Sequence, residues 1–353
     1  MSRIQLSSFL ANKFLIYNKC SILPRIVRGF YRGLVLNKPT LKTIEIFPTF
    51  ECDSACQMCS VEKYKKYSVG DLSLSDYKKL SREARELGVI AFSILGGEPT
   101  MKGNLEEIIQ ALDPARFFIT MVTNSISLTK ERLASLQESG LNSICFSLDN
   151  LDKDKNNEIR GNKGHYDKVM QAIKWSNKLG LHITISPVAF HGELGGFREI
   201  LEYAKKNGFA VGAGAVGYVG NAEGKDDILL TEAENKTLRE WLKKYHFLRF
   251  DWSLSYKLKH QCPAGQEKIG ITNIGDVVGC SLNPISFGNI RKEPLKVIWE
   301  RMNRFSQFAK DFPGCLVAED RHYIDNYIRP IIDKPANPVF YKDHPSIRND
   351  IKD

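Results

Sequence analysis

The sequence has few of the features that mark membrane-spanning, secreted or repeat proteins. No apolar run reaches the length of a membrane-spanning helix. Eight cysteines in 353 residues are too few for a disulfide scaffold in a chain of this length, and no internal repeat or low-complexity segment is present. These absences argue against a membrane-spanning protein and a disulfide-rich domain. The short spacing of several cysteines instead indicates metal binding in a reducing compartment, so we expect a cytoplasmic protein.

Acidic residues are absent from the first 43 positions. This segment contains eight of the nine excess positive charges of the chain, at Arg3, Lys13, Lys19, Arg25, Arg28, Arg32, Lys38 and Lys42. The rest of the chain is therefore almost neutral, which gives little electrostatic support for a nucleic-acid partner.

The basic N-terminal segment also has a helical pattern of apolar residues. They recur between the arginines at Ile22, Leu23, Ile26, Val27, Phe30, Tyr31 and Leu34. Three interpretations are open: a helix packed on the body of the protein, a helix in the interface of an anionic membrane, or a targeting peptide. A strand pattern begins at Thr43 without a linker, which argues against the targeting peptide.

From Thr43 the sequence alternates between strand-like and helix-like segments. Apolar runs typical of buried strands lie at 43–50, 89–95, 117–122, 143–148, 182–189 and 210–216. Helix-like stretches lie between them, at 74–87, 104–112, 129–138, 166–179 and 196–207. Repeated strand–helix units predict an α/β fold with a parallel sheet. Six such strands are fewer than the eight of a full barrel, so we expect a partial (β/α)6 barrel of the TIM type.

The pattern changes after residue 228. A helix is predicted at 230–244, a hairpin at 270–278 and another helix at 292–308. We therefore expect a basic amphipathic arm, a barrel core, a connecting helix with a linker, a small hairpin-plus-helix extension and a C-terminal tail. Their residues are 1–42, 43–228, 229–261, 262–330 and 331–353.

Three cysteines gather directly after the first predicted strand, at Cys52, Cys56 and Cys59. Barrel enzymes keep their chemistry at the carboxyl ends of strands. Three thiolates on one loop can hold three irons of a four-iron cluster and leave the fourth iron open to a ligand that is not protein. A zinc site and free buried thiols are the alternatives, but no histidine follows closely to complete a zinc site. We expect Cys20 and Cys145 to be ordinary buried thiols.

Small and polar residues also follow the later strands, where the site of a barrel enzyme is expected. The candidates for ligand binding are Gly96, Gly97, Glu98, Pro99, Asn124, Ser147, Asp149 and Arg160. The glycines allow a ligand to approach the backbone closely, and Glu98 can pair with an ammonium group. Asn124 and Asp149 are alternatively helix caps or turn residues, and Arg160 is alternatively a solvated surface residue.

The cysteine loop and the Gly-Gly-Glu-Pro stretch resemble the radical S-adenosylmethionine (SAM) superfamily, and the likeness continues through Thr123-Asn124 and Ser147-Leu148-Asp149. It implies that the three cysteines bind a [4Fe–4S] cluster whose open iron is chelated by SAM. Met58 stands where the family usually has an aromatic residue, a departure that affects packing near the adenine and leaves ligation intact.

The same resemblance implies individual roles for the candidate residues. Residues 96–99 bind the SAM amino group, Ser147 lies near the SAM ribose or carboxylate, and Arg160 pairs with the SAM carboxylate. The partly open, six-stranded barrel is also what the resemblance implies.

The extension resembles the auxiliary-cluster domain that follows many such barrels. It is closer to the short (twitch) form than to the long (SPASM) form, because no further cysteine-rich run follows Cys315. The resemblance implies a second iron–sulfur cluster, and its ligands are Cys262, Cys280 and Cys315. Structural zinc and free thiols are the alternatives. A four-iron cluster there lacks one ligand, which is supplied by Glu319, Asp320 or His322 unless the site is open to substrate.

The resemblance finally implies a radical SAM enzyme, in which the cofactors carry the hard chemistry and a ferredoxin or flavodoxin supplies an electron. We expect a small-molecule substrate, such as a sugar, alcohol, nucleotide or lipid-linked precursor. The alternative is maturation of a ribosomally made peptide, which the arm argues against because it is too short for a leader-binding domain. A non-catalytic iron–sulfur electron carrier is a third hypothesis, but a carrier needs no SAM site.

Overall fold

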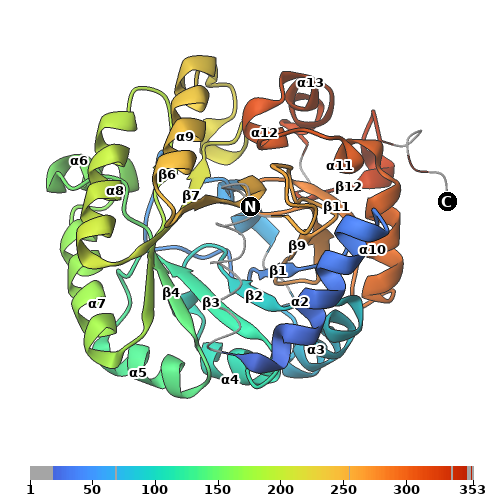
Figure 1. The fold of residues 1–353 in the computed structure, drawn as a ribbon, viewed down its shortest axis with the longest axis horizontal. Helices are drawn as coiled ribbons and strands as arrows, with labels where there is room; N and C mark the ends of the chain where they lie inside the picture. Colours follow the sequence, from blue (N-terminus) through green and yellow to red (C-terminus); the bar gives the residue numbers. More distant parts are fainter. Residues whose placement is uncertain (1–18, 68–69, 254, 335–336, 348–350, 352–353) are drawn as a thin grey trace.

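The computed structural model describes residues 19–67, 70–253, 255–334, 337–347 and 351. Its centre is a parallel sheet that curves into a partial barrel with helices on the outside (Figure 1). The strands β1 (Thr43–Ile46), β2 (Ala91–Ile94), β3 (Phe118–Thr123), β4 (Ser143–Phe146), β5 (His182–Ile185) and β7 (Ala210–Ala215) lie side by side in that order. Every pairing between these neighbours is parallel, which confirms the predicted α/β barrel.

Two parts of the sheet differ from the prediction. The run predicted as one strand over 182–189 is interrupted at Pro187, because proline has no N–H for a ladder. Its second part is β6 (Val188–Ala189), which pairs with β7. A further parallel strand, β8 (Leu248–Phe250), pairs with the other side of β7. The prediction assigned β8 to a linker because a strand of three residues is too short to show an alternating pattern.

Helices connect the strands and cover their outer face: α3 (Leu74–Leu87), α4 (Leu105–Ala111), α5 (Lys130–Glu138), α6 (Lys153–Arg160), α7 (His165–Leu179), α8 (Leu194–Asn207) and α9 (Glu232–Lys244). All except α6 match predicted segments to within two residues. The prediction missed α6 because Ile159 is its only buried apolar residue, so the sequence shows no helical periodicity there.

The C-terminal extension continues the barrel sheet. β9 (Lys268–Ile271) pairs in parallel with β1, and β10 (Asp276–Val278) and β11 (Ile285–Asn289) follow as antiparallel neighbours. β12 (Val339–Phe340), in the predicted tail, pairs in parallel with β11. The extension and part of the predicted tail are therefore built onto the barrel as one sheet.

The predicted helix at 292–308 is divided at Phe305 into α10 (Leu295–Arg304) and α11 (Ser306–Ala309). Two short helices follow, α12 (Leu316–Glu319) and α13 (Arg321–Tyr323).

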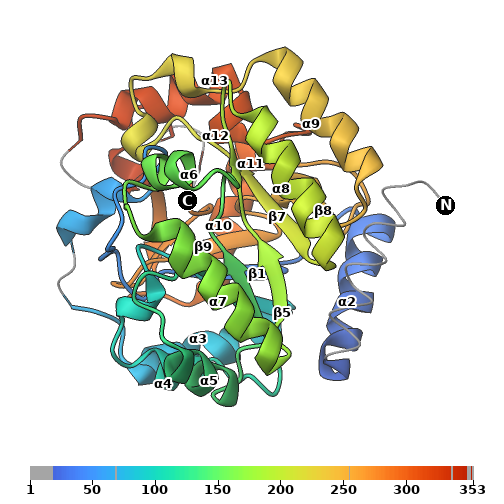
Figure 2. The same ribbon diagram turned by 90° about the vertical axis from the view of Figure 1, so that its left-hand side faces the viewer.

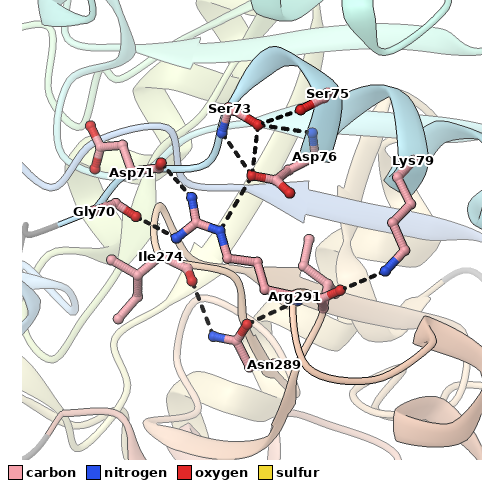
Figure 3. A network of polar contacts seen from close by, with 10 residues as sticks. Gly70, Asp71, Ser73, Ser75, Asp76, Lys79, Ile274, Asn289 and Arg291 are labelled. Atoms are coloured by element: carbon pink, nitrogen blue, oxygen red, sulfur yellow. Dashed lines mark hydrogen bonds and ion pairs between the residues drawn. The ribbon is translucent and has the colours of Figure 1, made fainter.

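Arg291, which follows β11, joins the extension to the segment before α3 (Figure 3). Its guanidinium donates hydrogen bonds to the carbonyl oxygens of Gly70 and Asp71, both at 2.5 Å. Its Nε donates to the Asp76 carboxylate at 3.3 Å. A single planar group with several donors thus fixes the extension against the start of α3.

The helix of the basic arm, α2 (Leu23–Phe30), lies beside the N-terminal ends of the strands (Figure 2). Ile22 and Ile26 are buried against residues that begin β2 and β3. Arg25 donates a hydrogen bond to the carbonyl oxygen of Val89 at 2.5 Å. Residues 20–30 therefore pack on the barrel, as the first interpretation of the arm predicted. The rest of the predicted arm before position 19 lies outside the described residues.

The two cysteines outside the predicted sites differ in their surroundings. Cys20 is exposed, which corrects the prediction of a buried thiol: the turn at Cys20–Ile22 buries only Ile22. Cys145 on β4 is partly buried and lies inside the barrel. Among the described residues, no helix has the length and hydrophobicity needed to cross a membrane.

Candidate functional site

The predicted site residues gather around one cavity at the C-terminal ends of the barrel strands. The cavity has a volume of about 590 Å³ and extends down the barrel. Its lining includes Cys52, Cys56, Cys59, Gly96, Gly97, Glu98, Asn124, Ser147 and Arg160. Pro99 is buried at the start of a short turn, and Asp149 is buried behind Arg160. The structure therefore brings together most of the residues that the sequence singled out.

The loop that carries Cys52, Cys56 and Cys59 is held by hydrogen bonds from distant segments. The Gln57 amide donates to the carbonyl oxygen of Ile159 at 3.0 Å. Asn221 donates twice, from its side chain to the Cys56 carbonyl oxygen at 2.8 Å and from its amide to the Cys59 carbonyl oxygen at 2.9 Å. These bonds attach the loop to the end of α6 and to the turn after β7.

Asn124 and Asn162 hold the first part of the same loop. The Asn124 side chain donates to the Asp53 carboxylate at 2.7 Å and lies 3.6 Å from the Cys52 sulfur. The Asn162 side chain donates to the Asp53 carbonyl oxygen at 3.0 Å. Asn124 is thus a structural neighbour of the cysteines, and its predicted contact with a ligand stays a prediction.

Gly97 and Gly161 are two of the glycines that lie where the neighbouring backbone leaves no space for a side chain. A Cβ atom on Gly97 would come within 2.1 Å of the Glu51 carbonyl oxygen, and one on Gly161 within 2.2 Å of the Ala55 carbonyl oxygen. Gly161 also has φ of +60° at the C-terminus of α6, a conformation that glycine adopts readily. Both glycines allow the chain to pack directly against the cysteine loop.

Glu98 is 1% exposed and its carboxylate accepts several hydrogen bonds. The donors are the Thr100 amide and hydroxyl, the Thr123 hydroxyl at 2.8 Å and the Asn124 amide at 2.7 Å. Burial raises the pKa of Glu98, and these hydrogen bonds oppose the rise. The carboxylate therefore connects the ends of β2 and β3 at the wall of the cavity.

Arg160 lies beside Cys56 and is held by Asp149. Its Nε donates to the Asp149 carboxylate, whose other oxygen accepts from the Val188 amide at 2.8 Å. Burial alone lowers the pKa of Arg160, but Asp149 and the Cys56 thiol raise it above its usual range. Its Nη2 is buried without a hydrogen-bond partner among the described residues. A buried, charged donor without an acceptor suits an anionic ligand such as a carboxylate.

The second set of cysteines, Cys262, Cys280 and Cys315, lies in the extension. Burial raises the pKa of all three thiols. Glu45 and Cys262 raise the pKa of Cys280 further, and Cys262 and Cys280 raise that of Cys315. Metal binding to such thiols requires that their protons be released. The structure thus brings three partly buried cysteines from separate segments into one neighbourhood.

The three residues named as a fourth ligand have other contacts. Glu319 pairs with Arg239 and accepts a hydrogen bond from the Cys315 amide at 2.9 Å. Asp320 pairs with Lys310 and caps α13, whereas His322 is exposed. Glu319 or Asp320 can therefore become a fourth ligand only if an existing contact is broken, whereas the exposed His322 ring needs no ion pair to break.

Ligand geometry bears on the zinc alternative for both sets. Among the described residues, no three His, Cys, Asp or Glu side chains converge as the ligands of one metal ion do.

Sequence reasoning missed Asn162, Asn221 and Gly161. Asn162 and Gly161 directly follow the predicted Arg160, and Asn221 follows β7 in Val219-Gly220-Asn221. Asparagine and glycine beyond a strand or helix are ordinary turn residues, so nothing in the sequence distinguished these positions from other turns.

Two family models match the chain. The radical SAM superfamily model matches residues 46–204, and a model of an iron–sulfur cluster-binding domain (SPASM) matches residues 262–320. The PqqA peptide cyclase of Rhizobium meliloti is 26% identical over 276 residues, which cover 74% of each chain. The AdoMet-dependent heme synthase of Nitratidesulfovibrio vulgaris is 23% identical over 317 residues, which cover 78% of this chain and 83% of the relative.

Solved structures with the same fold include two that were determined with ligands. Streptococcus suis SuiB bound to its precursor peptide SuiA has a TM-score of 0.62 and 20% identity, over 74% of this chain and 65% of that chain. The chain thus spans just under two thirds of SuiB. The anSMEcpe structure with bound AdoMet has a TM-score of 0.57 and 18% identity, over 73% and 80%.

The packing of Gly161 against the cysteine loop predicts a specific defect in iron binding. Gly161→Ala should displace the loop and lower the iron bound per chain after anaerobic reconstitution, toward about half if only the extension keeps a cluster. Iron analysis and thermal unfolding measure the two effects.

Gly180→Ala is the matched control. Gly180 also ends a helix with positive φ, 69°, but no atom lies within 4 Å of the point that a Cβ on this residue would occupy. Both variants carry the same backbone strain of about 1 kcal/mol. Equal iron content in the two variants would contradict the role given to Gly161.

Proposed function

The chain belongs to the radical SAM superfamily and carries an iron–sulfur cluster-binding domain behind its barrel, and we propose that it modifies a peptide or protein substrate. The PqqA peptide cyclase and the peptide-bound SuiB structure support this substrate class. It replaces the small-molecule substrate expected from the sequence. The length of the arm is a poor guide, because a cavity lined by backbone and side chains can itself recognise a peptide.

Members of this family are enzymes that use a [4Fe–4S] cluster and SAM, and the SPASM domain implies auxiliary iron–sulfur clusters. When bound and reduced by one electron, the cluster and SAM supply a 5′-deoxyadenosyl radical for hydrogen abstraction. We propose a donor of the ferredoxin or flavodoxin type for that electron.

The residues of the cavity have complementary roles in this proposal. Cys52, Cys56 and Cys59 hold the first cluster, and Cys262, Cys280 and Cys315 hold the auxiliary one. Arg160, oriented by Asp149, places its free Nη2 toward the SAM carboxylate. Residues 96–99 with Glu98 bind the SAM amino group, and Asn124 and Ser147 line the pocket beside them.

The strongest support for the proposal comes from the lining of the cavity. The cavity is lined both by the first cysteine loop and by Pro263, Ser281 and Leu282, which neighbour Cys262 and Cys280. A substrate in the barrel therefore lies between the two cysteine sets. This position suits an oxidative modification, because an auxiliary cluster beside the substrate can accept an electron from it.

Protease sensitivity distinguishes a peptide from a small molecule. The reconstituted enzyme with dithionite and SAM should form 5′-deoxyadenosine slowly alone and several-fold faster with a peptide fraction of an extract from its own cells. Prior digestion of that fraction with protease should abolish the stimulation. If only a protease-resistant small-molecule fraction accelerates 5′-deoxyadenosine formation, the substrate is a small molecule and the proposal is wrong.

We also propose that α2 attaches the enzyme to an anionic membrane surface. Opposite its buried face, the segment 23–36 exposes large apolar side chains: Leu23, Val27, Tyr31, Leu34, Val35 and Leu36. Val27 is 59% and Val35 66% exposed. The arginines of this segment have no acidic neighbours in the first 43 positions. Apolar burial and about 1 kcal/mol per basic residue near an anionic surface favour docking.

Flotation with vesicles of phosphatidylglycerol and phosphatidylcholine tests this attachment. The full chain should float at low salt and less at high salt, because salt screens the arginines. Val27→Ser with Val35→Ser should weaken flotation without changing thermal stability, since both side chains are exposed. Val297→Ser, which changes an exposed valine on α10, is the control. A wild-type protein that does not float, or a double variant that floats equally, rules out the attachment.

A further inference from the structure

The cavity has a second end, deep in the barrel, that presents basic groups. Lys42 precedes β1, His182 begins β5, and Arg249 on β8 lies opposite Gly212 in the first half of β7. The three basic residues and Gly212 all line the cavity that is also lined by the cysteine loop. These positions are near the N-terminal ends of the strands, whereas the cysteines follow the C-terminal end of β1. The basic groups therefore face the cavity from the end opposite the cofactor residues.

Arg249 points into the barrel. Its neighbours Leu248 and Phe250 are both buried in the hydrophobic core, and side chains alternate between the two faces of a strand. Gly212, its register partner on β7, has no side chain to fill the space beside the guanidinium. A Cβ atom there would already lie 3.2 Å from Thr184. The space next to Arg249 thus belongs to the cavity.

Arg249 has no hydrogen bond or ion pair with any described residue, and its Nε is buried without a partner. Burial lowers its pKa, with no carboxylate to oppose the effect. Burial is the main cause that lowers the pKa values of Lys42 and His182, and the charge of Arg249 lowers both further. Arg249 is partly buried, and a guanidinium whose Nε is buried without a counter-charge among the described residues is costly. A ligand that supplies an anion would remove this cost.

The other charges of this region already have partners. Lys268 pairs with Glu45 at 2.5 Å and with Asp251. Glu267 accepts hydrogen bonds from the Tyr256 amide at 2.9 and 3.1 Å and lies near Lys42. Lys42 also has no carboxylate at hydrogen-bond distance among the described residues, but Glu267 is close enough to raise its pKa. For Arg249 burial is the single effect on the pKa, so no carboxylate among the described residues offsets its charge.

We infer that Arg249 binds a carboxylate of the substrate and so fixes the part of the substrate that reaches deepest into the barrel. The guanidinium fork matches a carboxylate with two parallel hydrogen bonds. The peptide nature of the substrate rests on the proposed function, and an aspartate or glutamate side chain or a peptide C-terminus provides the same group. Anchored at Arg249, the substrate extends along the cavity toward the cysteine loop, where the hydrogen is abstracted.

Three blocked amino acids test the site on the reconstituted enzyme with SAM and without reductant. N-acetyl-glutamate methylamide carries a side-chain carboxylate, N-acetyl-glutamine carries a terminal one, and N-acetyl-glutamine methylamide carries neither. Calorimetry should show that at least one carboxylate probe binds about 10- to 100-fold more tightly than the neutral probe, as expected for hydrogen bonds to a charged group. The preferred probe identifies the source of the carboxylate.

Variants separate a binding role from a structural one. Arg249→Gln should remove the preference for carboxylate probes, and Arg249→Lys should keep part of it. The melting temperature of Arg249→Gln should be unchanged or higher, because an unpaired buried charge is lost. Arg198→Gln, on the exposed surface of α8, controls for the loss of one charge and should bind as the wild type does.

Two results would overturn the inference. One is a wild-type enzyme that shows no preference for either carboxylate probe. The other is an Arg249→Gln variant that keeps the preference, or that loses it together with several degrees of melting temperature. Because no reductant is present, binding does not depend on turnover. Carboxylate binding through Arg249 combined with failure of the peptide-fraction assay would refute the proposed substrate class and support the anion site.

Discussion

The position of one irregular loop is the constraint on which the site depends. The segment from Cys52 to Cys59 has no strand or helix to hold it, so its shape comes from hydrogen bonds made by its surroundings. Asn124, Asn162 and Asn221 supply side-chain donors from three separate segments. Gly97 and Gly161 bring further backbone into direct contact with it. The three thiols that we propose as ligands of one cluster are thereby placed by the barrel itself.

The continuous sheet gives the second cysteine set a fixed relation to the first. β9 pairs with β1 over its whole length, so the extension begins beside the strand that leads into the cysteine loop. Across this junction Glu45 pairs with Lys268 and accepts a hydrogen bond from the Ser281 amide at 2.7 Å, next to Cys280. A buried ion pair of this kind is weak evidence for stability, but its geometry connects the two cysteine sets through the wall of the cavity.

The sequence was most informative where a motif is local. The cysteine loop, the Gly-Gly-Glu-Pro turn and the strand–helix alternation each occupy a short window, so their spacing, together with the family resemblance, indicated the barrel and most of the candidate site. Long-range partners were not visible in this way. Asn162 and Asn221 bind loop residues that lie 109 and 165 positions away. β8 is three residues long, and the position of Arg249 at the deep end of the cavity depends on the pairing of β8 with β7. Such features follow from tertiary packing, which overrides local pattern.

The central claim is that Cys52, Cys56 and Cys59 hold the catalytic cluster while the extension holds a separate one. Iron analysis and SAM cleavage in a variant with all three changed to alanine test it most directly, with Cys20→Ala as the control for an exposed thiol. The account predicts that about four of about eight irons per chain remain and that no 5′-deoxyadenosine forms with dithionite and SAM. Normal formation of 5′-deoxyadenosine, or a variant that holds zinc and no iron, would contradict it.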